Sequence, residues 1–168
     1  MGNIFRIFML LAVFTVVYGC GPVISKETLK QVDRNVTFEE VSKNPTQFIG
    51  KKVAFGGTII NTENEENRTL IEVLQEGLDY RLKPVEPAES AGRFLVAFDG
   101  FKDPAIYSKG KRITIAGTIT GVEDRKLGQI TYKYPVIKPD EHRLWIPRTY
   151  EREPSIGIGI GLGYTHID

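Results

Sequence analysis

The sequence predicts an all-β domain, a small five- to six-stranded barrel resembling an OB-fold with short helical turns, preceded by a signal peptide and a flexible tether. A motif occurs twice, at 44–59 and 103–119, and each copy ends in alternating apolar residues typical of a strand. Three more segments have strand character, at 69–75, 93–99 and 130–137. The absence of long amphipathic helices between them argues against a doubly wound α/β fold.

The first nineteen residues differ from the rest of the chain. Arg6 is their only charge, and the apolar run IFMLLAVFTVV follows it at residues 7–17. As a helix this run would rise about 16 Å, roughly half the hydrocarbon thickness of a bilayer. The pattern therefore predicts a secretory signal peptide over residues 1–19. The alternative is a buried core helix, which would show a polar face.

Cys20 is the only cysteine in the sequence, and it follows the apolar run and Gly19. The stretch VYGC resembles the bacterial lipobox, whose cysteine is acylated and becomes the first residue of the mature protein. A thiolate can be alkylated to a stable thioether, so Cys20 is predicted to be a lipidation site and not a catalyst. The alternative is an incidental free thiol. In such lipoproteins an Asp after the cysteine favours the inner membrane, so Gly21 indicates the outer membrane.

The polar residues after Cys20 show no clear periodicity, and residues 20–36 are predicted to form a lipidated, flexible tether with a reach of roughly 20 Å. The barrel domain is predicted over 37–150. Thr37 and Glu40 have the spacing of a capping box, which predicts a short helix up to about Lys43.

Each copy of the repeated motif has Asn or Asp before Pro, then an aromatic residue, Gly-Lys and a strand pattern. Asn or Asp before Pro predicts one helical turn, after which Phe48 or Tyr107 can face the core. Gly57 and Gly117 fall on the inward face of their strands, where glycine marks a bend or a bulge. Four basic residues stand at the strand entries and are predicted to be solvated edge protection, with a basic binding patch as the alternative: Lys51, Lys52, Lys111 and Arg112.

Two polar segments, NTENEENR at 61–68 and GVEDRKLG at 121–128, are predicted to be hairpin loops. The tail, residues 151–168, contains glycine alternating with Ile or Leu. This period-two pattern favours an edge strand or a segment at the membrane interface, and disorder is the alternative.

Several blocks in order resemble the Slp family of outer-membrane lipoproteins: GKKVAFGGTIIN, GFKDPAIYSKGKRITIAGTITG, YKYPVI and Leu144-Trp145. The resemblance covers roughly residues 38–147 and the lipidation signal. It implies a lipid-anchored outer-membrane protein that faces the periplasm and is associated with stress or stationary phase. It brings no catalytic residues with it.

The sequence favours no enzyme class. His142 and His166 have no Cys or carboxylate cluster at metal-ligand spacing, and no GxSxG, HExxH or phosphate-loop motif occurs. No catalytic residue, metal ligand or cofactor is therefore predicted. An envelope enzyme whose site is assembled only by folding stays an alternative.

A non-catalytic binding or structural module of the cell envelope is the preferred interpretation. The whole sequence has 22 basic and 21 acidic residues. Removing residues 1–19 removes one basic residue, Arg6, so 21 basic and 21 acidic residues are left. A chain with no net charge lacks the electrostatic attraction to phosphates that dominates nucleic-acid binding, so no nucleic-acid partner is expected. An OB module for oligonucleotides or oligosaccharides is the alternative.

The expected partners are membrane lipid through acylated Cys20 and an unknown envelope protein or glycan. Candidate contact residues are Tyr80, Phe101 and Trp145, for which core packing is the alternative.

Overall fold

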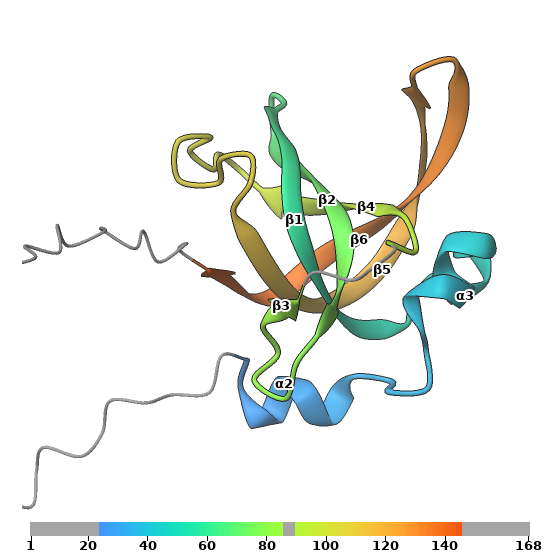
Figure 1. The fold of residues 1–168 in the computed structure, drawn as a ribbon, viewed down its shortest axis with the longest axis vertical. Helices are drawn as coiled ribbons and strands as arrows, with labels where there is room; N and C mark the ends of the chain where they lie inside the picture. Colours follow the sequence, from blue (N-terminus) through green and yellow to red (C-terminus); the bar gives the residue numbers. More distant parts are fainter. Residues whose placement is uncertain (1–23, 86–89, 146–168) are drawn as a thin grey trace, which may run out of the picture.

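A computed structural model of the chain describes residues 24–85 and 90–145 (Figure 1). The helical segments are α2 (Lys26–Gln31), α3 (Phe38–Lys43) and the 3₁₀ helix η1 (Pro45–Phe48). The strands are β1 (Lys52–Asn64), β2 (Arg68–Leu78), β3 (Pro84–Val85), β4 (Arg93–Asp99), β5 (Arg112–Leu127) and β6 (Ile130–Trp145). None of the helices within these ranges is long and apolar enough to cross a membrane. The predicted signal peptide, Cys20 and the 151–168 tail lie outside the described residues.

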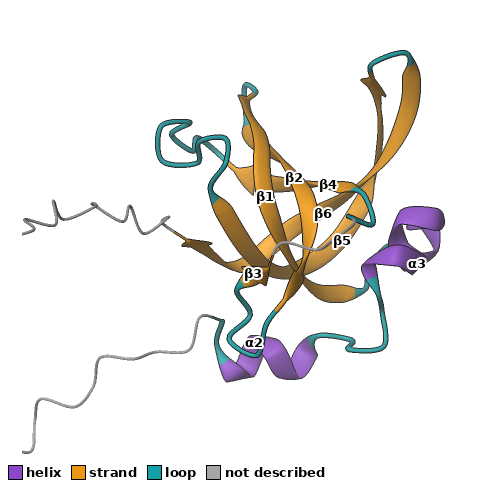
Figure 2. Cartoon of the chain, in the orientation of Figure 1, coloured by secondary structure: helices purple, strands orange, loops and turns teal. Residues whose placement is uncertain are grey.

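The five long strands form a closed barrel, which Figure 2 shows with the helices outside it. Going round the barrel, the order is β1, β2, β4, β6 and β5, and β5 pairs with β1 to close it. The β4–β6 pairing is parallel and the other pairings are antiparallel. The short strand β3 pairs with the end of β2. A small, closed, mixed barrel with few short helices confirms the predicted fold class, all-β and OB-like.

Apolar side chains fill the interior of the barrel. Phe38 of α3 packs edge-on against Phe55, with ring centroids 5.2 Å apart, and lies 5.6 Å from Phe94. The other buried members of this cluster come from α3 and all five long strands: Val41, Val53, Ile59, Ile71, Val73, Val96, Phe98, Ile113, Ile115, Ile119 and Ile137. The inside of the barrel is therefore a packed core.

The local signals before each repeated strand are largely confirmed. The hydroxyl of Thr37 accepts a hydrogen bond from the backbone N–H of Glu40, whose carboxylate accepts from the Thr37 N–H. Pro45 opens η1, as predicted. The second copy forms only a turn, in which the N–H of Tyr107 donates to the carbonyl of Asp103 at 3.0 Å. Phe48 and Tyr107 both pack against the core.

Gly57 and Gly117 are both needed for close strand packing, but only one lies at a bulge. The β5–β6 register shifts between Ala116 and Gly117, as predicted. At Gly57 the register with both neighbouring strands is regular, so of the predicted bend or bulge the bulge is absent there. A Cβ at either glycine would lie well under 3.0 Å from a backbone carbonyl oxygen, that of Leu74 or Lys138. Close approach of the neighbouring strand is the reason for glycine at these positions.

The two predicted hairpin loops are shorter than expected. Strand β1 continues to Asn64, and β5 continues to Leu127 before a turn at Gly128. Polar residues of β5 pair across the hairpin with β6, for example Asp124 with Lys133. Such cross-strand pairs stabilise a strand that buries little surface, so polarity alone did not mark a loop here.

The segment predicted to be a flexible tether over 20–36 is folded from Ile24 onward. Ile24 is fully buried, and α2 follows it with Ser25 as its N-cap. The helix contains no buried residue of its own, which explains why its sequence shows no apolar periodicity. Hydrogen bonds to the barrel hold it instead.

Candidate functional site

One outer face of the barrel is covered by two segments from outside it. Ile113 and Ile115 of β5 point into the core, so the alternate residues Thr114 and Ala116 point outward. Both outward residues are nevertheless fully buried. The covering segments are the N-terminal segment with α2 and the turn at 79–83 between β2 and β3.

Glu141 of β6 holds the start of the N-terminal segment. Its carboxylate accepts hydrogen bonds from the Ser25 N–H at 2.7 Å, the Ser25 hydroxyl at 2.6 Å and the Thr28 hydroxyl at 2.6 Å. These bonds favour the ionised form and lower the pKa of Glu141 below its usual value. We call Ser25, Thr28 and Glu141 the N-terminal clasp. It fixes the chain directly after the buried Ile24.

The basic residues of the first motif copy hold the other end of the N-terminal segment. The ammonium of Lys52 donates to Gln31 and to Asp140, each at 2.8 Å. Lys51 forms an ion pair with Asp33 at 3.2 Å, and this hydrogen bond lowers the pKa of Asp33. The prediction of solvated edge protection is therefore correct only in part: the Lys51 side chain is 52% exposed, but both lysines also bind the docked N-terminal segment.

The turn at 79–83 presents an aromatic side chain to solvent. The carboxylate of Asp79 accepts from the N–H groups of Arg81 and Lys83, both at 2.8 Å. Tyr80 is 86% exposed, and the Arg81 guanidinium lies 5.2 Å from the centre of its ring. The carbonyl of Leu82 accepts from the Thr114 hydroxyl at 2.5 Å, which fastens the turn to β5. We call residues 79–83 the aromatic turn.

Trp145, at the end of β6, is half-buried next to the aromatic turn. Its indole N–H donates to the Thr114 hydroxyl at 2.9 Å, and the Lys83 ammonium lies 5.9 Å from its ring centre. Thr114 is two residues from Ala116, the strand partner of Glu141, so the clasp and the aromatic turn occupy neighbouring positions on one face. In the view of Figure 1, α2 and this turn both lie at the lower end of the molecule.

Phe101 lies at the opposite end of β2 from Tyr80. It is 72% exposed, directly after Gly100, whose N–H donates to the carbonyl of Asn67 before the start of β2. The structure thus brings Trp145 to the aromatic turn and places Phe101 elsewhere. Sequence reasoning missed the clasp, although Ser25 three residues before Thr28 could have indicated a helix N-cap.

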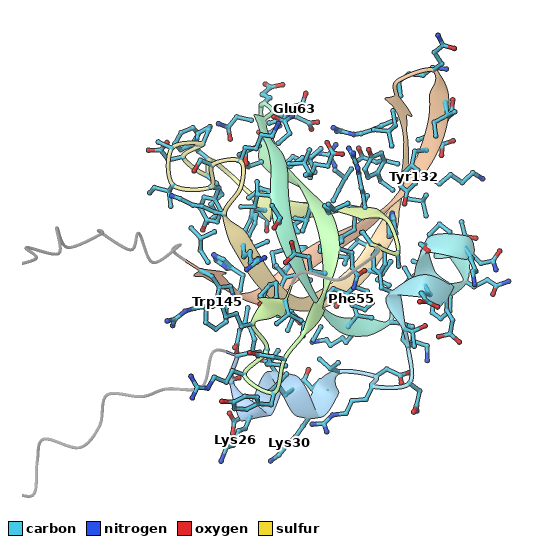
Figure 3. All side chains as sticks on the ribbon, viewed as in Figure 1. Lys26, Lys30, Phe55, Glu63, Tyr132 and Trp145 are labelled. Atoms are coloured by element: carbon cyan, nitrogen blue, oxygen red, sulfur yellow. The ribbon has the colours of Figure 1, made fainter. Side chains whose placement is uncertain are left out.

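A network of ion pairs joins the tips of two hairpins, and we call it the hairpin network. Arg68 pairs with Glu123 at 2.8 Å, and Arg125 pairs with Glu63 at 2.9 Å and Glu65 at 3.5 Å. Figure 3 shows side chains filling the space between the β1–β2 tip at Glu63 and the β5–β6 hairpin at Tyr132. OB-folds commonly bind ligands between their corresponding loops, and here charged pairs span that space.

The strand face next to the hairpin network is also occupied by side chains of the barrel. Tyr134 is buried, and its hydroxyl donates to Glu72 at 2.9 Å, while Arg93 pairs with the same carboxylate at 2.7 Å. Burial is the main cause that raises the pKa of Tyr134. Leu95 and Val136 pack around the tyrosine ring. This face is a second, smaller core with a paired polar edge.

His142 occupies a structural position. Its ring packs on Phe98 with centroids 4.8 Å apart, and Nε2 lies 2.8 Å from the Tyr107 hydroxyl. Burial lowers the pKa of His142, and the positive charge of Lys102 lowers it further. Within residues 24–85 and 90–145, no group of three His, Cys, Asp or Glu side chains could hold a metal ion.

Comparison with known proteins agrees with the resemblance found in the sequence. Residues 17–164 match the family described as outer membrane lipoprotein Slp. A Haemophilus influenzae protein described as uncharacterized is 37% identical over 117 residues, covering 68% of this chain and 63% of the relative. The Escherichia coli lipoprotein YeaY is 30% identical over 105 residues, which cover 62% of this chain and 54% of YeaY. The Escherichia coli outer membrane protein Slp is 31% identical over 115 residues, which cover 68% of this chain and 61% of that protein.

The chain thus spans between about half and two thirds of the length of these curated relatives, 54% to 63%. The family match, in contrast, covers most of this chain, including the predicted lipidation signal and the whole barrel. The chain belongs to the Slp family of outer membrane lipoproteins.

Proposed function

We propose that Cys20 carries the lipid and holds the barrel on the periplasmic side of the outer membrane, where the domain acts as a non-catalytic binding or structural module. The family supports an envelope lipoprotein, and Cys20 is the only cysteine among the 168 residues. The observation that carries the proposal is the N-terminal clasp. It fixes the folded domain to begin only four residues after Cys20.

The contacts of the ionisable side chains support a non-catalytic role. Glu72, Glu141 and His142 each bond to groups that stabilise the barrel or its covering segments. Buried Glu76 accepts from Thr58 at 2.6 Å and pairs with Arg112 at 3.0 Å. A general acid or base needs a group free to exchange a proton with a substrate, and these groups serve the fold.

We place the contact with an envelope protein or glycan at the loop that follows β4. Phe101 and Ile106 of this loop are 72% and 53% exposed, at the end of β2 away from the clasp. Nucleic acid fits less well, because the hairpin network occupies the space between the hairpins and the mature chain has no net charge. The link to stress or stationary phase follows from the family resemblance, and protein levels measured through growth and starvation test it.

Replacing the cysteine tests the anchor. We expect Cys20→Ser to abolish incorporation of a radiolabelled fatty acid and to leave a soluble or unprocessed chain, because serine forms no thioether. Cell fractionation with lipid labelling measures both effects. Phe101→Ser is the matched control: it should be lipidated normally but lose crosslinks to a partner in the membrane. An unchanged outer-membrane location of Cys20→Ser, with no lipid on the wild type, contradicts the proposal.

A further inference from the structure

We propose that α2 and the aromatic turn form a membrane-docking face, which lies against the anionic phospholipid headgroups of the leaflet that holds the anchor. This inference rests on the proposed lipidation of Cys20 and adds an orientation to it. The docking face comprises Lys26, Lys30, Tyr80, Arg81 and Lys83. Figure 3 shows Lys26 and Lys30 together at the lower edge of the molecule.

Chain length places this face close to the lipid. Three residues separate Cys20 from Ile24, and a chain extends at most about 3.6 Å per residue, so the two Cα atoms are within about 14 Å of each other. Ile24 is buried and the clasp holds Ser25, so this short connection ends at a fixed point on the barrel. By comparison, the 11 residues of β2 extend about 35 Å. Because the connection is so short, the part of the barrel surface that carries the clasp lies nearest to the membrane.

The exposed aromatic side chain suits a membrane interface. Tyr80 is the most exposed of the large apolar residues in the described part of the chain, at 86%, and it stands at the tip of a turn. The hydrogen bonds of Asp79 and Leu82 hold that turn on the barrel, so Tyr80 is presented on a fixed support. Tyrosine has an apolar ring and a polar hydroxyl, and for this reason it is enriched at the headgroup level of membranes.

The charge of the docking face complements anionic headgroups. The face has four basic side chains. Arg143 of β6 is a fifth, and its guanidinium lies 5.6 Å from the ring centre of Trp145. The acidic residues of the same segments are Glu27 and Asp79, and β6 adds Asp140 and Glu141. Asp79 accepts from the N–H groups of its own turn, Asp140 pairs with Lys52, and the clasp holds Glu141. The excess is local, since the mature chain has no net charge. Each basic side chain near an anionic surface contributes roughly fivefold to binding.

Fluorescence quenching by lipid tests the orientation. Tyr80→Cys is labelled with nitrobenzoxadiazole in the lipidated full-length protein, in which Cys20 is a thioether and does not react. Phe101→Cys is the matched control, an exposed aromatic position at the opposite end of β2. The proteins are incorporated into phosphatidylethanolamine and phosphatidylglycerol vesicles that carry a headgroup quencher. We expect strong quenching of the label at 80 and little at 101.

Charge variants test the chemistry of the face. Lys26→Glu with Lys30→Glu should lower the ratio of docked to undocked domain about fivefold or more for each lysine, and quenching at 80 should fall with it. The matched control reverses two lysines of the distant β5–β6 hairpin, Lys126→Glu with Lys133→Glu, and should leave quenching unchanged. Replacing phosphatidylglycerol by phosphatidylcholine should also reduce it.

Flotation of the same vesicles separates this inference from the proposed anchor. Protein that floats with equal quenching at 80 and 101 retains the anchor and overturns the docking face. Full quenching at 80 in phosphatidylcholine overturns the assignment to anionic headgroups. Wild-type protein, expressed with its signal peptide, that does not float overturns both the anchor and the docking face.

Discussion

The two copies of the repeated motif pair with each other to close the barrel. Phe55 of β1 lies opposite Ile115 of β5, and the surrounding register is antiparallel. The N–H of Gly50 donates to the carbonyl of Ile119 at 2.8 Å, and the N–H of Gly110 donates to the carbonyl of Ile59 at 2.9 Å. Equivalent residues thus make equivalent bonds, as in a local two-fold arrangement. The comparison shows that one short sequence, used twice, supplies both sides of the closure.

The basic residues that begin the two strands show where the copies differ. In the first copy Lys51 and Lys52 bind the N-terminal segment. In the second copy Lys111 donates to the carbonyl of Ile106 in its own loop at 2.8 Å, and Arg112 pairs with the buried Glu76. The motif determines the strand entry, but the segments packed outside each strand determine what the side chains bind.

The largest effect should come from the equivalent glycines. Gly57→Ala and Gly117→Ala each place a methyl group against a backbone carbonyl of the neighbouring strand, which cannot move without breaking its pairing. We expect each to cost about 3 kcal/mol, at the upper end of what overpacking costs. Urea denaturation of the full chain measures this. Gly121→Ala is the control, because its Cβ would meet nothing within 4 Å. A normal midpoint for one of the two variants would break the equivalence of the copies.

An effect of intermediate size should come from the basic residues at the strand entries, whose replacement should destabilise the two copies by different amounts. Arg112→Ala leaves the carboxylate of Glu76, which is 4% exposed, without this ion pair, and we expect a loss of about 1–3 kcal/mol. Lys52→Ala removes a more exposed pair with Asp140 and should cost less than about 1 kcal/mol. Denaturant melts of both variants give the comparison. Equal losses would show that the two strand entries are energetically alike.

The smallest effect should be a pH dependence specific to the second copy. Tyr107 contacts His142, whereas Phe48, its counterpart in the first copy, has no hydroxyl. The pKa of His142 is lowered from 6.5 in the folded state, so the unfolded chain binds a proton more readily as the pH falls below that value. Stability should therefore decline below about pH 6.5, and His142→Gln should remove this part of the decline. Melts at about pH 7.5 and about pH 5.5 measure it. Identical pH profiles for the two proteins would contradict the assignment.

The sequence alone determined the features that depend on neighbouring residues. The capping box at Thr37, the turns at the repeated Pro positions and the inward alternation of Phe55 and Ile115 are local consequences of side-chain hydrogen bonding and strand geometry. The predicted five- to six-stranded barrel was correct for the same reason. The family blocks also lie mainly in these strands and turns.

Only the tertiary structure decided which distant residues meet. Glu141 lies 116 positions from Ser25, and no local pattern predicts that its carboxylate holds the N-terminal segment. The exposed residues Tyr80 and Phe101 look alike in the sequence, yet the course of β2 puts them at opposite ends of the barrel. Polar contacts of this kind have no periodic signature, because they depend on the register and closure of the sheet. Local chemistry therefore specified the barrel, and its closure specified which surface lies next to the clasp.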